Sequence, residues 1–188
     1  MCGRPGTGVG GETVKRAMPD LLIRIKKKTD GSAALTCTRA DGSVTWQRQD
    51  GQLGRFFPLH DLTHYAVESS LGFNQAFFGL VADGWDMSDF GRESPRGKPP
   101  EQALLAELIV GFFDLERATG VIENVDAFNE KIVTWYRDND RPVPTFRLAA
   151  HDIERIRALR AEMFAKWRAL PPGEALEIPF DRVPQPAS

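Results

Sequence analysis

Between Leu21 and about Gln49, apolar residues occur in short runs rich in β-branched and aromatic side chains. Segments 21–25, 34–38 and 44–47 each have the length and composition of a β-strand. Asp30-Gly31 and Asp41-Gly42 separate these segments, and an Asp-Gly pair is a strong signal for a tight hairpin turn. The pattern therefore predicts a three-stranded antiparallel meander.

After Gly54 the apolar residues follow the period of a helix. Pro58 suits a first helical turn and Gly72 suits a helix end, so the first helix is predicted between them. Further helices are predicted over 74–82, 101–119, 125–137 and 150–170, with 91–100 as an exposed loop. Segment 176–180 is predicted to be a closing strand that returns to the N-terminal sheet.

These elements predict the α+β class: a small antiparallel sheet, which the C-terminal strand can join, packed on a bundle of about five helices. Residues 1–18 are glycine-rich and lack an apolar period, so we expect a disordered tail followed by one α+β domain over 19–188. Gly6, Gly8 and Gly11 match the spacing of a dinucleotide-binding loop, but that loop requires a preceding strand, for which this segment has no room.

Composition narrows the classes of partner. A net charge of −2 gives no reason to expect nucleic acid or an anionic membrane, which leaves a small molecule or a protein. Two cysteines, Cys2 and Cys37, do not make a disulfide scaffold, so we expect a reduced, cytoplasmic protein. No run reaches the roughly 18 apolar residues of a membrane span, and the N-terminus lacks the apolar stretch of a signal peptide.

The predicted helix after Pro58 carries two of the chain's three histidines, His60 and His64. Residues four apart on a helix lie about 40° apart around the axis and roughly 6 Å apart along it, so both imidazoles can reach one ion. The position of His60 near the helix N-terminus favours neutral imidazole, the form that binds metal. The spacing predicts a divalent-metal site, with zinc as the expected ion.

Two carboxylates share about a quarter of the helix surface with these histidines. Asp61 borders the face at about 100° from His60, where it can orient a histidine, coordinate the ion or act as general base. Glu68 lies roughly 12 Å from His60 along the axis, too far to share one ion with both histidines. We therefore expect Glu68 to orient a histidine or to act as the base.

Two histidines are too few for a stable site, so another element must supply a third ligand. Glu107 and Asp114 lie seven residues apart on the apolar helix over 101–119, nearly on one face. Charged residues are mostly exposed, so the ordinary expectation is that both face solvent; otherwise Glu107 is the preferred third ligand. His151 is the other candidate, although His151-Asp152 is also the expected start of the last helix.

The motif His60-Asp61-x-x-His64 resembles the His-Asp-x-x-His core of an accessory protein family of ubiquinone biosynthesis, which implies a zinc-like site on a helix. In that family eleven further residues and then a glutamate follow, and Ala76 stands at the corresponding position here. The zincin protease signature needs glutamate directly after the first histidine, where this chain has Asp61, so a protease is not expected.

Two hypotheses follow. In the first, the protein is a metal-dependent hydrolase that binds one ion through His60, His64 and Glu107, with Asp61 or Glu68 as general base. In the second, it is a non-catalytic binding or assembly module whose sheet recruits a partner, and the histidines form a structural polar network. A cleft beside the histidines with an open coordination position favours the first hypothesis.

Overall fold

The computed structural model describes residues 18–91, 94–122 and 124–184. Four strands form one antiparallel sheet in the order β3-β2-β1-β4. Their bounds are β1 Leu21–Lys27, β2 Ala33–Arg39, β3 Val44–Gln49 and β4 Ala175–Phe180. The predicted meander is confirmed, and the C-terminal strand pairs with β1, opposing Ile178 to Ile23. One residue in two along these strands is buried on the inner face.

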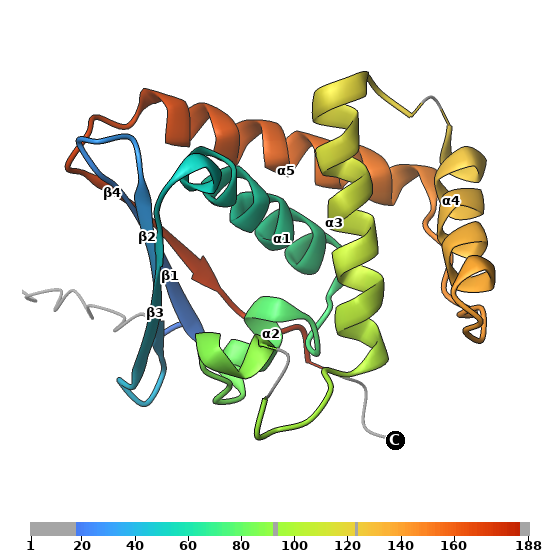
Figure 1. Ribbon diagram of the computed structural model, residues 1–188, viewed down its shortest axis with the longest axis horizontal. Helices are drawn as coiled ribbons and strands as arrows, with labels where there is room; N and C mark the ends of the chain where they lie inside the picture. Colours follow the sequence, from blue (N-terminus) through green and yellow to red (C-terminus); the bar gives the residue numbers. More distant parts are fainter. Residues whose placement is uncertain (1–17, 92–93, 123, 185–188) are drawn as a thin grey trace, which may run out of the picture.

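Five α-helices lie on one side of this sheet and confirm the α+β class (Figure 1). Their bounds are α1 Phe57–Leu71, α2 Phe77–Ala82, α3 Glu101–Thr119, α4 Val125–Asp138 and α5 Ala150–Ala169. Two 3-10 turns, η1 (Gln52–Arg55) and η2 (Met87–Phe90), flank α1 and α2. None of the helices in the described ranges is both long enough and apolar enough to cross a bilayer.

Helix α2 begins three residues later than the sequence predicts. Asn74 instead holds the C-terminal segment: its side chain donates to the Val183 carbonyl (2.7 Å) and accepts from the Val183 N–H (3.1 Å). The backbone N–H of Gln75 donates to the side chain of Gln102 at 2.6 Å. These long-range partners hold Asn74 and Gln75 outside the helix, and Ala76, the residue before the helix, has an extended backbone.

Helix α1 lies at the centre of the fold and contacts both parts of the core. Leu62 belongs to a cluster with the inner face of the sheet, Phe78 and Phe164. Ala66 and Val67 belong to a second cluster with side chains of α3, α4 and α5. A helix enclosed in this way also buries polar side chains, which are stable there only when they have hydrogen-bond partners.

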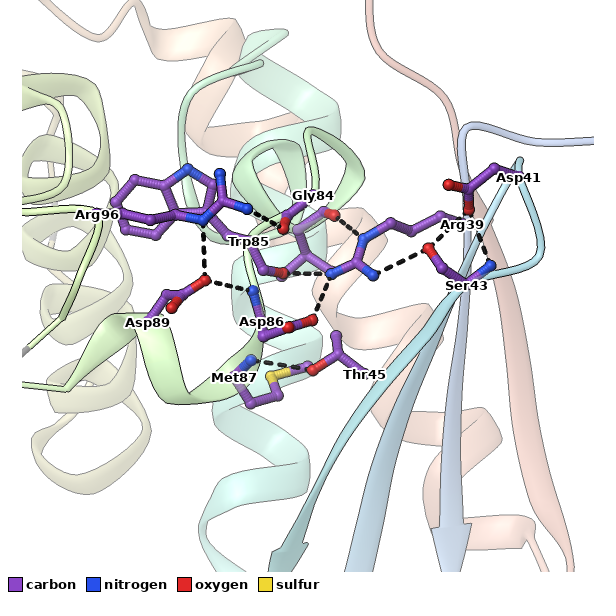
Figure 2. Close-up of polar contacts among 11 residues, drawn as sticks. Arg39, Asp41, Ser43, Thr45, Gly84, Trp85, Asp86, Met87, Asp89 and Arg96 are labelled. Atoms are coloured by element: carbon purple, nitrogen blue, oxygen red, sulfur yellow. Dashed lines mark hydrogen bonds and ion pairs between the residues drawn. The ribbon is translucent and has the colours of Figure 1, made fainter.

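The buried Arg39 side chain ties the sheet to the segment between α2 and α3 (Figure 2). It donates to the carbonyls of Val81 (2.7 Å) and Trp85 (2.6 Å) and to the Asp86 carboxylate (2.9 Å). The side chain of Thr45 on β3 accepts the N–H of Met87 at 3.0 Å. Three of these contacts fix the start of η2 against β2 and β3, and the fourth, to Val81, holds α2.

The predicted tail, residues 1–18, lies outside the described residues except for Met18, which is exposed.

Candidate metal centre

His60 and His64 lie one turn apart on α1 and point their rings toward the same space, as their spacing predicts. The ring centroids are 4.7 Å apart and the ring planes are nearly perpendicular. The His64 side chain is only 5% exposed and that of His60 is 18% exposed. Both imidazoles are therefore set into the protein and held by neighbouring groups.

A carboxylate contacts the Nδ1 atom of each imidazole. Asp114 Oδ2 lies 2.8 Å from Nδ1 of His60, and Glu68 Oε1 lies 3.2 Å from Nδ1 of His64. An ionised carboxylate can only accept a hydrogen bond, so each Nδ1 must carry the proton. In neutral imidazole the Nε2 atom is then the free lone pair, which is the arrangement seen in histidine ligands oriented by carboxylates.

Glu107 on α3 faces both Nε2 atoms. Its Oε2 atom lies 3.0 Å from Nε2 of His64 and its Oε1 atom lies 3.8 Å from Nε2 of His60. One potential ligand atom from each of the three residues lies within 4.8 Å of the others. Ligands of a tetrahedral zinc ion, bound at about 2.05 Å, lie roughly 3.3 Å apart. The ligand atoms of the three residues would therefore have to move closer together to hold such an ion.

Asp114 differs from the ordinary expectation for a charged helix residue. It is buried, and besides contacting His60 it lies 3.5 Å from Arg117, measured between Oδ1 and the guanidinium. The sequence predicts that Asp114 shares the face of Glu107 but does not indicate a role for it in the site. Its seven-residue spacing from Glu107 was the available signal, because the face that presents Glu107 to the histidines presents Asp114 about two turns further on.

Glu68 uses both of its carboxylate oxygens inside the protein. While Oε1 contacts His64, Oε2 accepts the backbone N–H groups of Phe78 (2.9 Å) and Gly79 (3.3 Å). These N–H groups belong to the first turn of α2, which has no internal partner for them. Burial raises the pKa of Glu68, while His64 and the two N–H groups oppose that effect. Of the two roles expected for Glu68, this placement favours orienting His64.

Asp61 is buried beside the histidines, and its Oδ2 atom accepts a hydrogen bond from the Gln49 side chain on β3. Burial raises the pKa of Asp61 to about 6, although Gln49 and the nearby histidines oppose the shift. This pKa is close to the value that suits a general base at neutral pH.

Charge couples His64 to its two carboxylate neighbours. Burial alone would lower the pKa of His64, but hydrogen bonds and charge from Glu107 and Glu68 outweigh it and raise the pKa to about 10. The pKa of Glu107 is lowered. Desolvation would raise it, but the hydrogen bond and the charge of His64 outweigh that effect. The Glu107 side chain is 59% exposed, so solvent screens this pair more than the buried pair of His64 with Glu68.

A cavity of about 590 Å³ opens directly beside these residues. His60, Asp61, His64 and Glu107 are among the residues that line it. Glu68 and Asp114 do not line it, which agrees with their contacts to the far sides of the imidazoles. A ligand in the cavity can therefore reach the Nε2 atoms and Asp61 but neither of the two orienting carboxylates.

The other candidate ligand, His151, lies at the start of α5. Its side chain is exposed and its Nε2 atom is 3.3 Å from its neighbour Asp152. Within the described residues it belongs to no group of potential metal ligands. Ala76, the position at which the resembling family has glutamate, is buried. Among the candidates for the third ligand, Glu107 is thus the one that the fold brings to the Nε2 atoms of both histidines.

Comparisons of the chain with protein-family models, with curated proteins and with solved structures give no match. The geometry of the site is therefore the basis for its functional interpretation.

Proposed function

We propose that this protein binds one divalent metal ion, zinc in the first instance, through His60, His64 and Glu107, and uses it to hydrolyse a small-molecule substrate. The observation that carries the proposal is the convergence of two Nε2 atoms and one carboxylate at the wall of a cavity. Catalytic zinc sites commonly have three protein ligands and keep the fourth position for water or substrate. The cytoplasm, expected from the cysteine content, is the proposed compartment.

The surrounding residues suit this role. Asp114 and Glu68 fix the protons on the Nδ1 atoms and so leave each Nε2 atom available. A zinc ion held by these residues would lower the pKa of a coordinated water to about 7. Asp61 lines the same cavity, and in this proposal it takes the proton of that water. In hydrolysis the water oxygen joins the acyl or phosphoryl group, and the leaving group takes the proton as its bond breaks.

Two histidines and one carboxylate also form the ligand set of Fe(II) sites in oxygen chemistry. Asp61 favours hydrolysis over this alternative, because a buried carboxylate with a pKa of about 6 that lines the same cavity would be a suitable proton acceptor. Elemental analysis of the purified protein distinguishes the two metals.

One contact favours the non-catalytic alternative. The 3.0 Å separation of His64 Nε2 and Glu107 Oε2, together with the raised pKa of His64, describes a protonated histidine held between two carboxylates. Such a network is complete without metal and is consistent with a binding or assembly module. In that case added zinc leaves the stability of the protein unchanged.

The test is to screen the zinc-loaded protein against ester, amide and phosphoester substrates, with Asp61→Asn as the variant. We expect Asp61→Asn to bind zinc and to lose about 10²–10⁴-fold in kcat, the usual contribution of a general base. Glu162→Gln on the exposed face of α5 is the matched control and should retain full activity. Absence of metal-dependent activity against every substrate class in the screen would contradict the hydrolase proposal.

A further inference from the structure

The cavity beside the histidines is apolar over most of its wall. Phe57 comes from α1, Phe77 from α2, Phe90 from η2 and Leu104 from α3. These four elements meet only through the tertiary fold, so the apolar wall is not a property of one amphipathic helix. Ligand sites for small molecules are typically clefts of about 300–1,000 Å³ with mostly apolar walls and few polar groups. At about 590 Å³ this cavity falls in that range.

The aromatic side chains form a continuous series that starts at the candidate metal site. The His64 ring is 5.4 Å from Phe77, Phe77 is 4.8 Å from Phe90, and Phe90 is 5.5 Å from Trp85, measured between ring centroids. A group bound at the Nε2 atoms therefore has the rings of Phe77 and Phe90 beside it. Apolar atoms attached to that group would make its binding free energy more favourable, because they leave water and pack against this wall.

Polar contacts hold the far part of the wall in place (Figure 2). Arg96 donates to the Asp89 carboxylate at 3.0 Å and to the Gly84 carbonyl at 2.7 Å, and its guanidinium lies over the Trp85 ring. Asp89 also accepts the backbone N–H of Asp86 at 2.8 Å. Together with the Arg39 contacts, these bonds fix η2 and hence Phe90. A preorganised wall loses little conformational entropy when a ligand binds.

The extent of the cavity sets the size of the apolar group. Glu107 lies at the metal end, and Glu101, six residues earlier on α3, also lines the cavity. Six residues span about 9 Å along a helix axis. Tetrahedral carbon chains advance about 1.3 Å per bond of roughly 1.5 Å. The cavity therefore has room for a chain of about seven carbons, or for a ring on a short linker.

We propose that the substrates are esters or amides that carry an apolar chain or ring next to the hydrolysable bond, and that this apolar part lies against Phe77, Phe90 and Leu104. The proposal rests on the metal-dependent hydrolase function proposed above. Phe90 is then a specificity-determining residue: it contacts the apolar part of the substrate and takes no part in the chemistry.

The test uses linear alkyl hydroxamates, from acetohydroxamate to decanohydroxamate, titrated into the zinc-loaded protein by calorimetry. A hydroxamate group chelates zinc and leaves its tail to explore the cavity. We expect affinity to rise about fourfold per methylene, from about 0.8 kcal/mol for each buried methylene, and to level off near seven carbons. Phe90→Leu and Phe90→Ala should weaken the octanoyl compound, the alanine variant by about tenfold, and leave acetohydroxamate unchanged.

Trp46→Ala is the matched control, because Trp46 is an exposed aromatic residue of β3 that does not line the cavity. Thermal melts of both Phe90 variants show whether they are folded. Binding of acetohydroxamate with no gain from longer tails would overturn the proposal while the metal site stands.

A second measurement separates this proposal from the metal site. Linear alcohols from butanol to octanol, titrated into the chelator-treated protein by NMR, test the apolar wall without any ion. If no hydroxamate binds but alcohol affinity rises with chain length and falls in Phe90→Leu, the apolar wall is supported and the metal proposal fails. If neither series binds, the proposal is overturned.

Discussion

Replacing Glu68 by glutamine changes one oxygen to an amide and tests how His64 is prepared for metal binding. In the wild-type protein Glu68 accepts two backbone N–H groups through Oε2 and contacts His64 Nδ1 through Oε1. In the variant the two N–H groups require the amide oxygen, so the NH₂ group turns toward His64. The Nδ1 atom must then accept, which moves the ring proton to Nε2 and blocks that atom as a ligand.

The magnitude follows from the cost of restoring the other tautomer. When zinc binds Glu68→Gln, the Nδ1–H group of His64 must face the NH₂ group of the glutamine, so two donors oppose each other. The variant also lacks the wild-type hydrogen bond from His64 to a charged carboxylate, which is worth about 1.5–3 kcal/mol. We therefore expect the dissociation constant for zinc to rise about 10- to 100-fold, the range found for carboxylates that orient histidine ligands.

The assay is a competition titration of zinc against a fluorescent chelator at neutral pH, with wild type, Glu68→Gln and the control Glu162→Gln. Glu162 pairs with Lys166 on the exposed surface of α5, so its substitution should leave zinc affinity unchanged. Nitrogen-15 NMR of the imidazoles should show the proton of His64 on Nε2 in metal-free Glu68→Gln. Unchanged zinc affinity with that tautomer in place would refute the reasoning.

Further predictions concern protons and packing. Zinc affinity should rise about tenfold per pH unit between about pH 6 and 8, because zinc binding displaces the proton of His64, whose pKa is raised to about 10. A flat pH profile in the chelator competition would contradict this prediction. The raised pKa of His64 also means that protonation of His64 stabilises the metal-free protein. This stabilisation is fully present below pH about 6.5 and is lost as the pH rises toward about 10. Melting temperatures in chelator should therefore fall across this window in wild type but not in His64→Gln. Asp114→Asn should weaken zinc binding by up to about tenfold, less than Glu68→Gln, since no backbone donors prevent its amide from turning. Arg39→Met should lower the free energy of unfolding by about 2–4 kcal/mol in urea titrations, because it leaves buried carbonyls unpaired. Arg24→Met, which removes an exposed ion pair, should lower it by less than about 1 kcal/mol.

The strands and most helix bounds are predictable from the sequence because their signals are local. Asp-Gly turns, the glycine after Leu71 and the prolines near Leu170 act within a few residues. The start of α2 is different, since partners about thirty and over one hundred residues away hold Asn74 and Gln75 outside the helix. Such contacts leave no periodic trace in the chain.

The candidate site divides in the same way. Helical spacing alone places His60, His64 and Glu68 on one face of α1. The distances from Glu107 to the two Nε2 atoms, and from Asp114 to Nδ1 of His60, depend on how α3 crosses α1. That crossing is set by packing of two whole helices, so a sequence can nominate Glu107 but cannot assign Asp114 its partner.

The most direct test of the account is elemental analysis of protein purified without a histidine tag, for wild type and His64→Ala. Thermal melts establish that the variant is folded before its metal content is compared. We predict close to one zinc ion per wild-type chain and loss of that ion in His64→Ala. No metal in either protein, with a melting temperature that added zinc does not change, would contradict the metal site and favour the binding module.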